Sequence, residues 1–180
     1  RVIIADLRRL LVLERYGHTV LLPGYTGFVG KDTITVNPSY WVLPAFPAFA
    51  RVDDPVFWQR DHDQALILVR EHGFGPMHLP PDWMRIGSDG RLEIDPGKPP
   101  EFGYEAIRVF LWAALDGSVA SLPGVRPLLA EMNEEHGPSA TINLKTGKRS
   151  GNRAPAGFLA VGALCARQLG ERQEAHRLQE

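Results

Sequence analysis

The chain has 180 residues, of which 44% are hydrophobic and 23% are charged, and its formal net charge is −1. This length and composition allow one domain with a sizeable core, and the balanced charge argues against nucleic acid or an acidic membrane surface as a partner. A single cysteine, Cys165, excludes a disulfide framework, and no apolar run reaches the roughly 18 residues of a membrane-spanning helix.

The first 41 residues divide into a helical segment and an extended segment. Apolar residues at helical spacing predict a helix over residues 2–15, with Gly17 as its terminator. The sequence starts within this helical pattern, so we expect the chain to be part of a longer polypeptide. Residues 19–41 are rich in glycine, threonine and β-branched side chains, and this composition predicts strands or loops.

Two helices are predicted next. A short one covers residues 45–51. Asp54 and Pro55 have the residue types favoured at an N-cap and at the first helical position, and they open a predicted helix over residues 55–72. Gly73 ends this helix because glycine readily adopts the backbone conformation that follows a helix.

The second half of the chain mixes hairpins with helices. "MRIGSDGRLEI", residues 84–94, predicts a β-hairpin because Asp89 and Gly90 are favoured in tight turns. An apolar helix is predicted over residues 104–115, ending near Gly117. The remaining predicted elements are a helix over residues 126–136 that stops at Gly137, a small hairpin over 141–149 that turns at Thr146–Gly147, and two helices over 156–169 and 171–178 separated by Gly170.

The order of these elements indicates the fold class. Strands do not alternate with helices in the rhythm of a parallel sheet, which argues against a Rossmann or TIM-type fold. We therefore expect an all-α array of helices, with small β-hairpins in the connecting loops.

The helix predicted over residues 104–115 is apolar on nearly every side, yet it carries Glu105 and Arg108. A helix that is apolar all round is a buried one, and a buried charge is costly unless it is paired. The two charges are three residues apart, close enough to pair. Two interpretations stay open: a structural ion pair near the positive end of the helix dipole, or a carboxylate held by Arg108 and used as an acid or base.

The segment "LPPDWMR", residues 79–85, places Asp82 beside Trp83 after two prolines. An exposed tryptophan and a carboxylate suit a sugar-binding cleft, since the ring offers a flat face and the carboxylate accepts bonds from hydroxyl groups. The alternative is an inward-packed Trp83 with Asp82 bonded to nearby backbone.

The segment "NPSYW" gathers Asn37, Ser39, Tyr40 and Trp41 at the end of an extended stretch. Their polar and aromatic side chains are typical of a binding site. However, Asn-Pro is also an ordinary turn, and both aromatic side chains can belong to the core.

Other clusters give weaker signals. "RDHDQ", residues 60–64, contains residue types that can bind a metal ion. Adjacent residues of a helix do not share a face, however, so we expect this segment to be a solvated helix surface. The six histidines show no metal-ligand spacing. Cys165 lies in an apolar run and is expected to be a small buried side chain. No metal and no organic cofactor is predicted.

Taken in order, three segments resemble glycoside hydrolase family 8. They are "LLPGYTGF" with "VNPSYW", then "PPDW", then "FGYEAIRVFLWAAL", and the closing "APAGFLAVGAL" is also similar to the last barrel region of the family. The likeness is strongest to the endo-β-1,4-glucanases encoded with bacterial cellulose synthase. It covers most of residues 1–180, which it identifies as a single partial domain, the C-terminal portion of a catalytic domain.

The resemblance implies a periplasmic or secreted enzyme that hydrolyses β-1,4-glucan or cello-oligosaccharides with inversion, on an (α/α)6 barrel that is incomplete here. It also implies a functional link to the cellulose synthase complex. By position in the family motif, Glu105 is the general base that activates water. The residues that line or support the substrate cleft are then Asn37, Tyr40, Trp41, Asp82, Trp83, Tyr104 and Arg108.

Two departures from the family pattern bear on activity. The family's general acid lies in N-terminal helices that these 180 residues do not include, so we expect the segment alone to be inactive. The missing helices are expected from an N-terminal remainder of the barrel or from a second copy. The base position also holds Glu105 where the family has aspartate. The extra methylene moves the carboxylate by about 1.5 Å, which leaves a catalytically impaired glucan-binding or accessory protein as the alternative.

Overall fold

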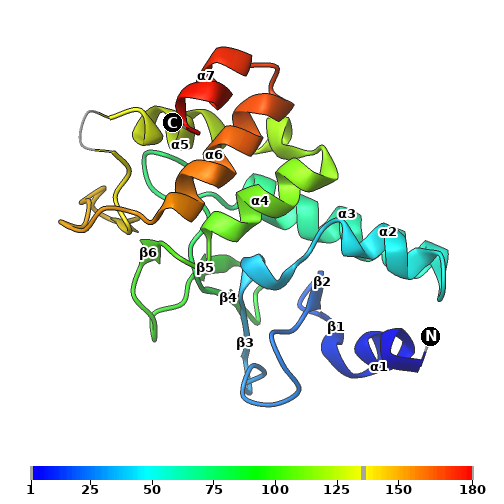
Figure 1. The fold of residues 1–180 in the computed structure, drawn as a ribbon. Coiled ribbons are helices and arrows are strands. Elements are labelled where there is room, and N and C mark those ends of the chain that lie inside the picture. The colour runs from blue at the N-terminus through cyan, green and yellow to red at the C-terminus, as the bar shows by residue number, and fades with distance from the viewer. Residues whose placement is uncertain (1, 135–136, 180) are drawn as a thin grey trace.

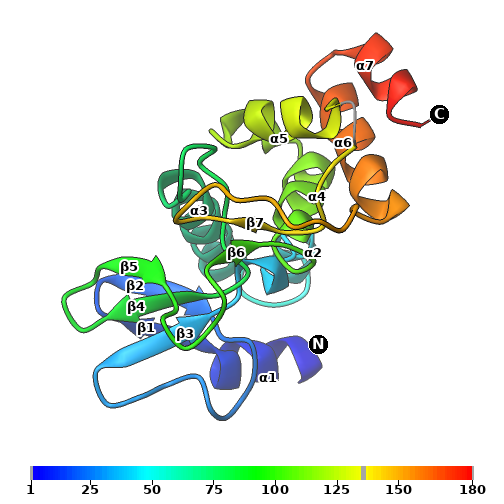
Figure 2. The same cartoon turned by 90° about the vertical axis from the view of Figure 1, so that its left-hand side faces the viewer.

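The computed structural model describes residues 2–134 and 137–179, and it is mainly helical, with small sheets at one side (Figures 1 and 2). The helices are α1 (Val2–Leu11), α2 (Ala45–Ala50), α3 (Pro55–Glu71), α4 (Ile107–Asp116), α5 (Val125–Met132), α6 (Ala156–Gln168) and α7 (Arg172–Arg177), with short 3-10 turns η1 (Pro38–Tyr40) and η2 (Val119–Ser121). The strands are β1 (Val12–Arg15), β2 (His18–Leu21), β3 (Thr33–Val36), β4 (Met84–Gly87), β5 (Leu92–Ile94), β6 (Glu101–Phe102) and β7 (Ile142–Asn143).

The described strands form three antiparallel sheets, of which β1–β2 is a simple hairpin. The predicted hairpin β4–β5 is confirmed, but β3 adds a third strand to it, with Val36 opposite Met84. The hairpin predicted over residues 141–149 is confirmed: its turn forms around Gly147, and Ile142 bridges Arg149 across it. In addition, β7 pairs with the distant β6, where Ile142 lies opposite Phe102. Periodicity within one segment does not reveal such long-range partners.

The predicted N-terminal helix is too long. It ends at Leu11, and β1 and β2 form a hairpin whose turn holds Tyr16 and Gly17 at positive φ angles of 56° and 80°. Val12 and Leu13 fit the helical spacing equally well, but they pair with Leu21 and Val20 across the hairpin. Strand pairing therefore overrides the local periodicity.

The helices in the middle of the chain lie close to their predicted positions. Asp54 caps α3 as expected, because its Oδ1 accepts from the backbone N–H groups of Val56 at 3.1 Å and Phe57 at 3.0 Å. Gly117 ends α4 with φ 85°. This helix starts only at Ile107, so Glu105 lies in the turn that precedes it.

Near the C-terminus, α5 ends at Met132 instead of continuing to residue 136, since the Asn133 N–H closes a tight last turn on the Ala130 carbonyl. Residues 135–136 of the predicted helix lie outside the described residues. The two closing helices are confirmed as α6 and α7, and Gly170 separates them with φ 80°.

The core lies between α4 and its neighbours. Phe102, Phe110 and Phe158 make edge-to-face contacts that join β6, α4 and α6. On the other side, Phe46 of α2 packs against Trp58 of α3. Contrary to the prediction, α4 is not buried on every side. Its inner face is covered, whereas Leu115 is more than half exposed.

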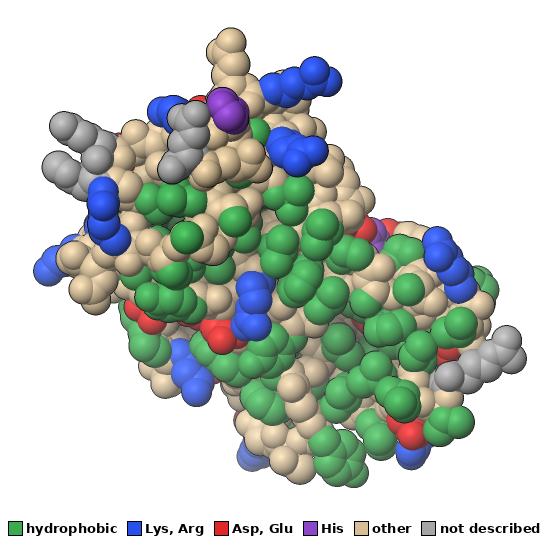
Figure 3. All heavy atoms as spheres, in the orientation of Figure 1, with side chains coloured by type: hydrophobic (Ala, Val, Ile, Leu, Met, Phe, Trp, Pro, Cys, Tyr) green, Lys and Arg blue, Asp and Glu red, His purple; other side chains and the backbone are tan. Residues whose placement is uncertain are grey.

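Apolar side chains also spread over the outer face, around α1 and across the middle of the molecule (Figure 3). None of the residues of α1 is fully buried, and Val2, Ile3 and Leu10 are exposed. A groove of about 330 Å³ runs along this helix, lined by Ile3, Asp6, Leu7, Leu10, Leu11 and Tyr25. Among the described helices, none is long and apolar enough to cross a membrane.

Candidate active site

Three segments that are distant in the sequence meet at one end of the β3–β4–β5 sheet. Val36 and Met84 are paired, so Asn37 and Trp83, which continue from them, lie at the same end of the sheet. The third segment, the turn that enters α4, follows β6, whose Glu101 carbonyl accepts the Asp82 backbone N–H at 2.9 Å. The fold thus brings "NPSYW", "PPDW" and "GYEAIR" together, as the sequence motifs predicted.

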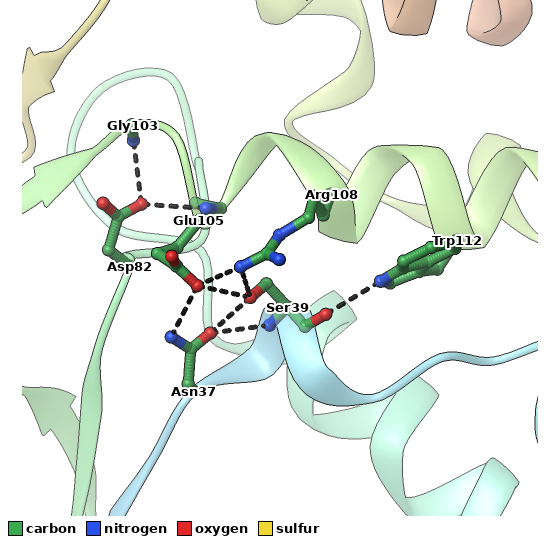
Figure 4. A network of polar contacts seen from close by, with 8 residues as sticks. Asn37, Ser39, Asp82, Gly103, Glu105, Arg108 and Trp112 are labelled. Atoms are coloured by element: carbon green, nitrogen blue, oxygen red, sulfur yellow. Dashed lines mark hydrogen bonds and ion pairs between the residues drawn. The ribbon is translucent and has the colours of Figure 1, made fainter. Parts of the chain in front are cut away.

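Glu105 lies at the centre of this arrangement (Figure 4). Its Oε2 accepts a hydrogen bond from Asn37 Nδ2 at 3.1 Å, lies 3.1 Å from Ser39 Oγ, and pairs with Arg108 Nη2. The side chain stays 33% exposed. Oε1, in contrast, receives no hydrogen bond from any residue that the structure describes, so it is available to a water molecule or a ligand.

Arg108 connects the carboxylate to its surroundings. Its Nη2 also donates to Ser39 Oγ at 3.1 Å, and its guanidinium carbon lies 5.5 Å from the centre of the Tyr40 ring. This distance is within the range of a cation–π interaction. Arg108 therefore holds the Glu105 charge and packs against the aromatic wall beside it.

Asp82 supports the turn that carries Glu105. It is buried, and its Oδ1 accepts from the backbone N–H groups of Gly103 at 2.9 Å and Ala106 at 2.8 Å (Figure 4). Burial raises the pKa of Asp82 to about 6, against the opposing effect of these two hydrogen bonds. The bonds of Asp82 to backbone agree with the alternative interpretation, in which Asp82 supports the site; a contact between Asp82 and a sugar hydroxyl stays a prediction.

Aromatic side chains form one wall of the site. The Trp83 ring stacks on Phe28 with the ring centres 6.2 Å apart and the planes 3° from parallel, and it meets Tyr40 edge to face at 6.3 Å. The Lys98 ammonium lies 5.0 Å from the centre of the Trp83 ring. Tyr40 is 38% exposed and Tyr104 is 57% exposed, so both rings remain accessible to a ligand.

Two of the predicted substrate-binding residues are buried instead. Trp41 is 2% exposed, packs in the core and donates from Nε1 to the Leu21 carbonyl at 2.9 Å. Asn37 is fully buried and binds Glu105, so it supports the site from within. Trp41 thus follows the alternative left open for it, a core position, and Asn37 supports the site without lining it. A motif shows that residues are neighbours in the chain and does not show which side chains face inward.

Some residues that shape the site had no predicted role of their own. Ser39 was only one member of "NPSYW", yet its hydroxyl contacts Asn37, Glu105 and Arg108. Phe28 lies in a glycine-rich loop and Lys98 in a polar one, so nothing local distinguishes them. Their contact with Trp83 depends on the tertiary fold.

The segment "RDHDQ" is a solvated surface only in part: Arg60 and Asp63 are exposed, as predicted. Asp61, in contrast, is 2% exposed, and His62 Nε2 lies 2.9 Å from Asp116 Oδ1 at the end of α4. Asp61 and His62 face inward because α3 packs against α2 and β2. Among residues 2–134 and 137–179, no three His, Cys, Asp or Glu side chains gather as metal ligands.

Comparisons with known proteins agree on one family. The model of the glycosyl hydrolases family 8 matches residues 3–175. The probable endoglucanase of Novacetimonas hansenii is 36% identical over 167 residues, which cover 88% of this chain and 47% of the relative. The endoglucanase of Cellulomonas uda is 32% identical over 177 residues, covering 98% of this chain and 48% of the relative.

Solved structures show the same similarity. The endo-beta-1,4-glucanase CMCax from Acetobacter xylinum superposes with a TM-score of 0.83 at 27% identity, over 98% of this chain and 62% of that chain. The endoglucanase from Komagataeibacter sucrofermentans gives a TM-score of 0.84 at 27% identity, over 99% and 61%. The chain spans about half the length of the curated relatives it matches.

Proposed function

The chain belongs to the glycosyl hydrolases family 8, and we propose that it is the base-bearing portion of an endo-β-1,4-glucanase that hydrolyses β-1,4-glucan with inversion. The observation that carries this proposal is the Glu105 carboxylate, which is anchored through one oxygen and open at the other beside an accessible aromatic wall. The relatives named as endoglucanases support the substrate class.

In this mechanism Glu105 acts as the general base. Its Oε1 takes a proton from a water molecule, which attacks the anomeric carbon from the face opposite the leaving group. Arg108 stabilises the carboxylate, and the Tyr40 and Trp83 rings provide surfaces on which the sugar can stack. An inverting hydrolase needs a second carboxyl group roughly 6.5–9.5 Å away as the acid. We place this general acid on a part of the protein outside these 180 residues.

The same proposal extends to the complete fold. The described helices form part of an (α/α)6 barrel, and the remaining helices cover the apolar groove along α1, where Ile3, Leu10 and Tyr25 lie at the surface. Two observations support this: apolar side chains gather on the exposed face around α1 (Figure 3), and the relatives are about twice as long as the chain.

The cellular context follows from the same family likeness. We place the protein in the periplasm or outside the cell, where it meets glucan chains as they are made, and we link it functionally to the cellulose synthase complex. The similarity to the Novacetimonas and Acetobacter endoglucanases supports this placement.

The test is reducing-sugar release from carboxymethylcellulose by the complete gene product. Glu105→Gln keeps the shape of the side chain and removes the base, so kcat is expected to fall by about 10²–10⁴-fold. Glu71→Gln, which removes an exposed carboxylate at the far end of α3, is the matched control and should leave the rate unchanged. An unchanged rate in Glu105→Gln would show that another residue is the base.

A second candidate function is glucan binding without turnover. The presence of glutamate at the base position favours it, because a displacement of about 1 Å can cost on the order of 100-fold in rate. Titration with cello-oligosaccharides, followed by tryptophan fluorescence through Trp83, detects binding in either case. Saturable binding without reducing-sugar release, together with a gain of activity in Glu105→Asp, would establish this second function.

A further inference from the structure

The amide orientation of Asn37 is fixed by the backbone around it. Its Oδ1 accepts the Ser39 backbone N–H at 3.0 Å and the Ser39 hydroxyl at 2.6 Å. If the amide were flipped, its NH2 group would face the Ser39 N–H, donor against donor. The amide nitrogen must therefore point the other way, where it donates to Glu105 Oε2 at 3.1 Å.

The Ser39 hydroxyl has one proton and three polar neighbours. Arg108 Nη2 donates to it at 3.1 Å, so the hydroxyl proton is free to go to Asn37 Oδ1 at 2.6 Å or to Glu105 Oε2 at 3.1 Å. The shorter contact favours Asn37. Ser39 thus links the guanidinium to the amide and keeps both aimed at the same carboxylate oxygen.

We infer that Asn37 and Ser39 are positioning residues for the water-activating carboxylate: they fix Glu105 through Oε2, so that Oε1 alone faces the water. This inference rests on the proposed function of Glu105 as the base. Both residues are buried, so they act from behind the carboxylate and do not contact the substrate. Ser39 is itself held in place, because its carbonyl accepts the Trp112 indole N–H at 2.8 Å (Figure 4).

The charged and titratable groups around Glu105 are few. Arg108 of α4 pairs with it, Tyr40 of η1 lies against Arg108, and Asp82 is the neighbouring acid, itself next to Glu101 of β6. Asn37 is the neutral donor to Glu105. Converting this donor to an acid therefore changes the balance of charge at Glu105 directly.

The decisive variant is Asn37→Asp. It keeps the acceptor that caps η1 through the Ser39 N–H, but it turns an oxygen toward Glu105 Oε2 in place of the N–H donor. A role limited to capping η1 predicts an unchanged kcat/KM, because aspartate keeps that acceptor. The positioning role predicts a loss of about 100-fold in kcat/KM at neutral pH and a shift of the acidic limb of the pH–rate profile to higher pH, by about one unit.

Ser39→Ala provides the second variant, since it keeps the backbone N–H and removes only the hydroxyl. We expect a loss of about 10-fold in kcat with little change in KM. Ser121→Ala and Asn152→Ala, at exposed positions far along the chain, are the matched controls and should behave as wild type.

The measurement that does not depend on turnover is the titration of the Glu105 side-chain carboxyl carbon by ¹³C NMR in the complete gene product. A midpoint at higher pH in Asn37→Asp supports the inference even if the wild type proves inactive on glucan, in which case only the proposed function fails. If the wild type is active and both variants match it in pH profile and in NMR midpoint, the inference is overturned. A rate loss without any shift of the midpoint overturns it as well.

Discussion

Asp61 allows a direct test of how burial of a charge affects the stability of this fold, because a buried carboxylate without a hydrogen-bond donor weakens the folded state. It is 2% exposed, and among the described residues none donates to its buried Oδ2. Burial raises the pKa of Asp61 from 3.8 to about 6, and the neighbouring Arg60 opposes the shift only in part. We predict that Asp61→Asn stabilises the protein at neutral pH.

The sign and size of this stability difference follow from the different affinity of the folded and unfolded states for the Asp61 proton. The folded state holds the Asp61 proton more tightly than the unfolded state, so ionisation favours unfolding. The penalty is absent below the unfolded pKa of 3.8 and complete above about 6. A difference of roughly two pKa units corresponds to about 3 kcal/mol at pH 7.5. The free energy of unfolding of Asp61→Asn, minus that of the wild type, should therefore rise by about 3 kcal/mol between about pH 3.5 and 7.5.

Urea unfolding followed by circular dichroism, repeated across this pH range, measures the difference directly. Other titrating groups are common to both proteins and cancel. Asp32→Asn is the matched control, since Asp32 is exposed and no described residue bonds its carboxylate; its difference from the wild type should stay flat. A flat difference for Asp61→Asn as well would refute the reasoning, because it would mean that Asp61 is solvated in the folded state.

Two further predictions concern other buried carboxylates. Arg149→Met leaves the buried Glu131, whose side chain is 2% exposed, without its ion-pair partner. This change should lower the free energy of unfolding by about 3 kcal/mol, which is at the low end for buried ion pairs because the Arg149 guanidinium is half exposed. In urea unfolding, the double change of both residues to Met should recover most of this loss, and failure to do so would contradict the explanation. Asp82→Ala removes the acceptor of two backbone N–H groups and should cost about 2 kcal/mol, whereas Asp82→Asn, whose amide oxygen can accept the same bonds, should cost less. Equal thermal destabilisation of these two variants would show that the hydrogen bonds are not what holds the turn.

Local chemistry made several elements predictable. Asp54 and Pro55 mark the start of α3, and Gly117 marks the end of α4, because a cap and a left-handed glycine act within a few residues of the chain. The motif around Glu105 and Arg108 also pointed to the centre of the site. Here the sequence spacing alone implied a contact, and the structure contains it.

Other features depend on partners far along the chain. The pairing of β3 with β4 and the inward turn of Trp41 are set by tertiary packing, which no local pattern encodes. Asp61 shows the same limit. Its neighbours on α3 are polar, so the sequence predicted that it faces solvent, but the elements packed against α3 bury it. For the same reason Ser39 could not be distinguished from the other residues of its motif.

The pairing of β3 with β4 has a consequence for the order of folding. These strands lie about 50 residues apart, and closing a loop of that length costs on the order of 3 kcal/mol of chain entropy before any contact compensates it. The segments that surround Glu105 continue directly from these two strands and from β6. The hydrophobic contact of α2 with α3 is local by comparison and can form early. We therefore expect the geometry around Glu105 to form late in folding, after much of the helix is in place.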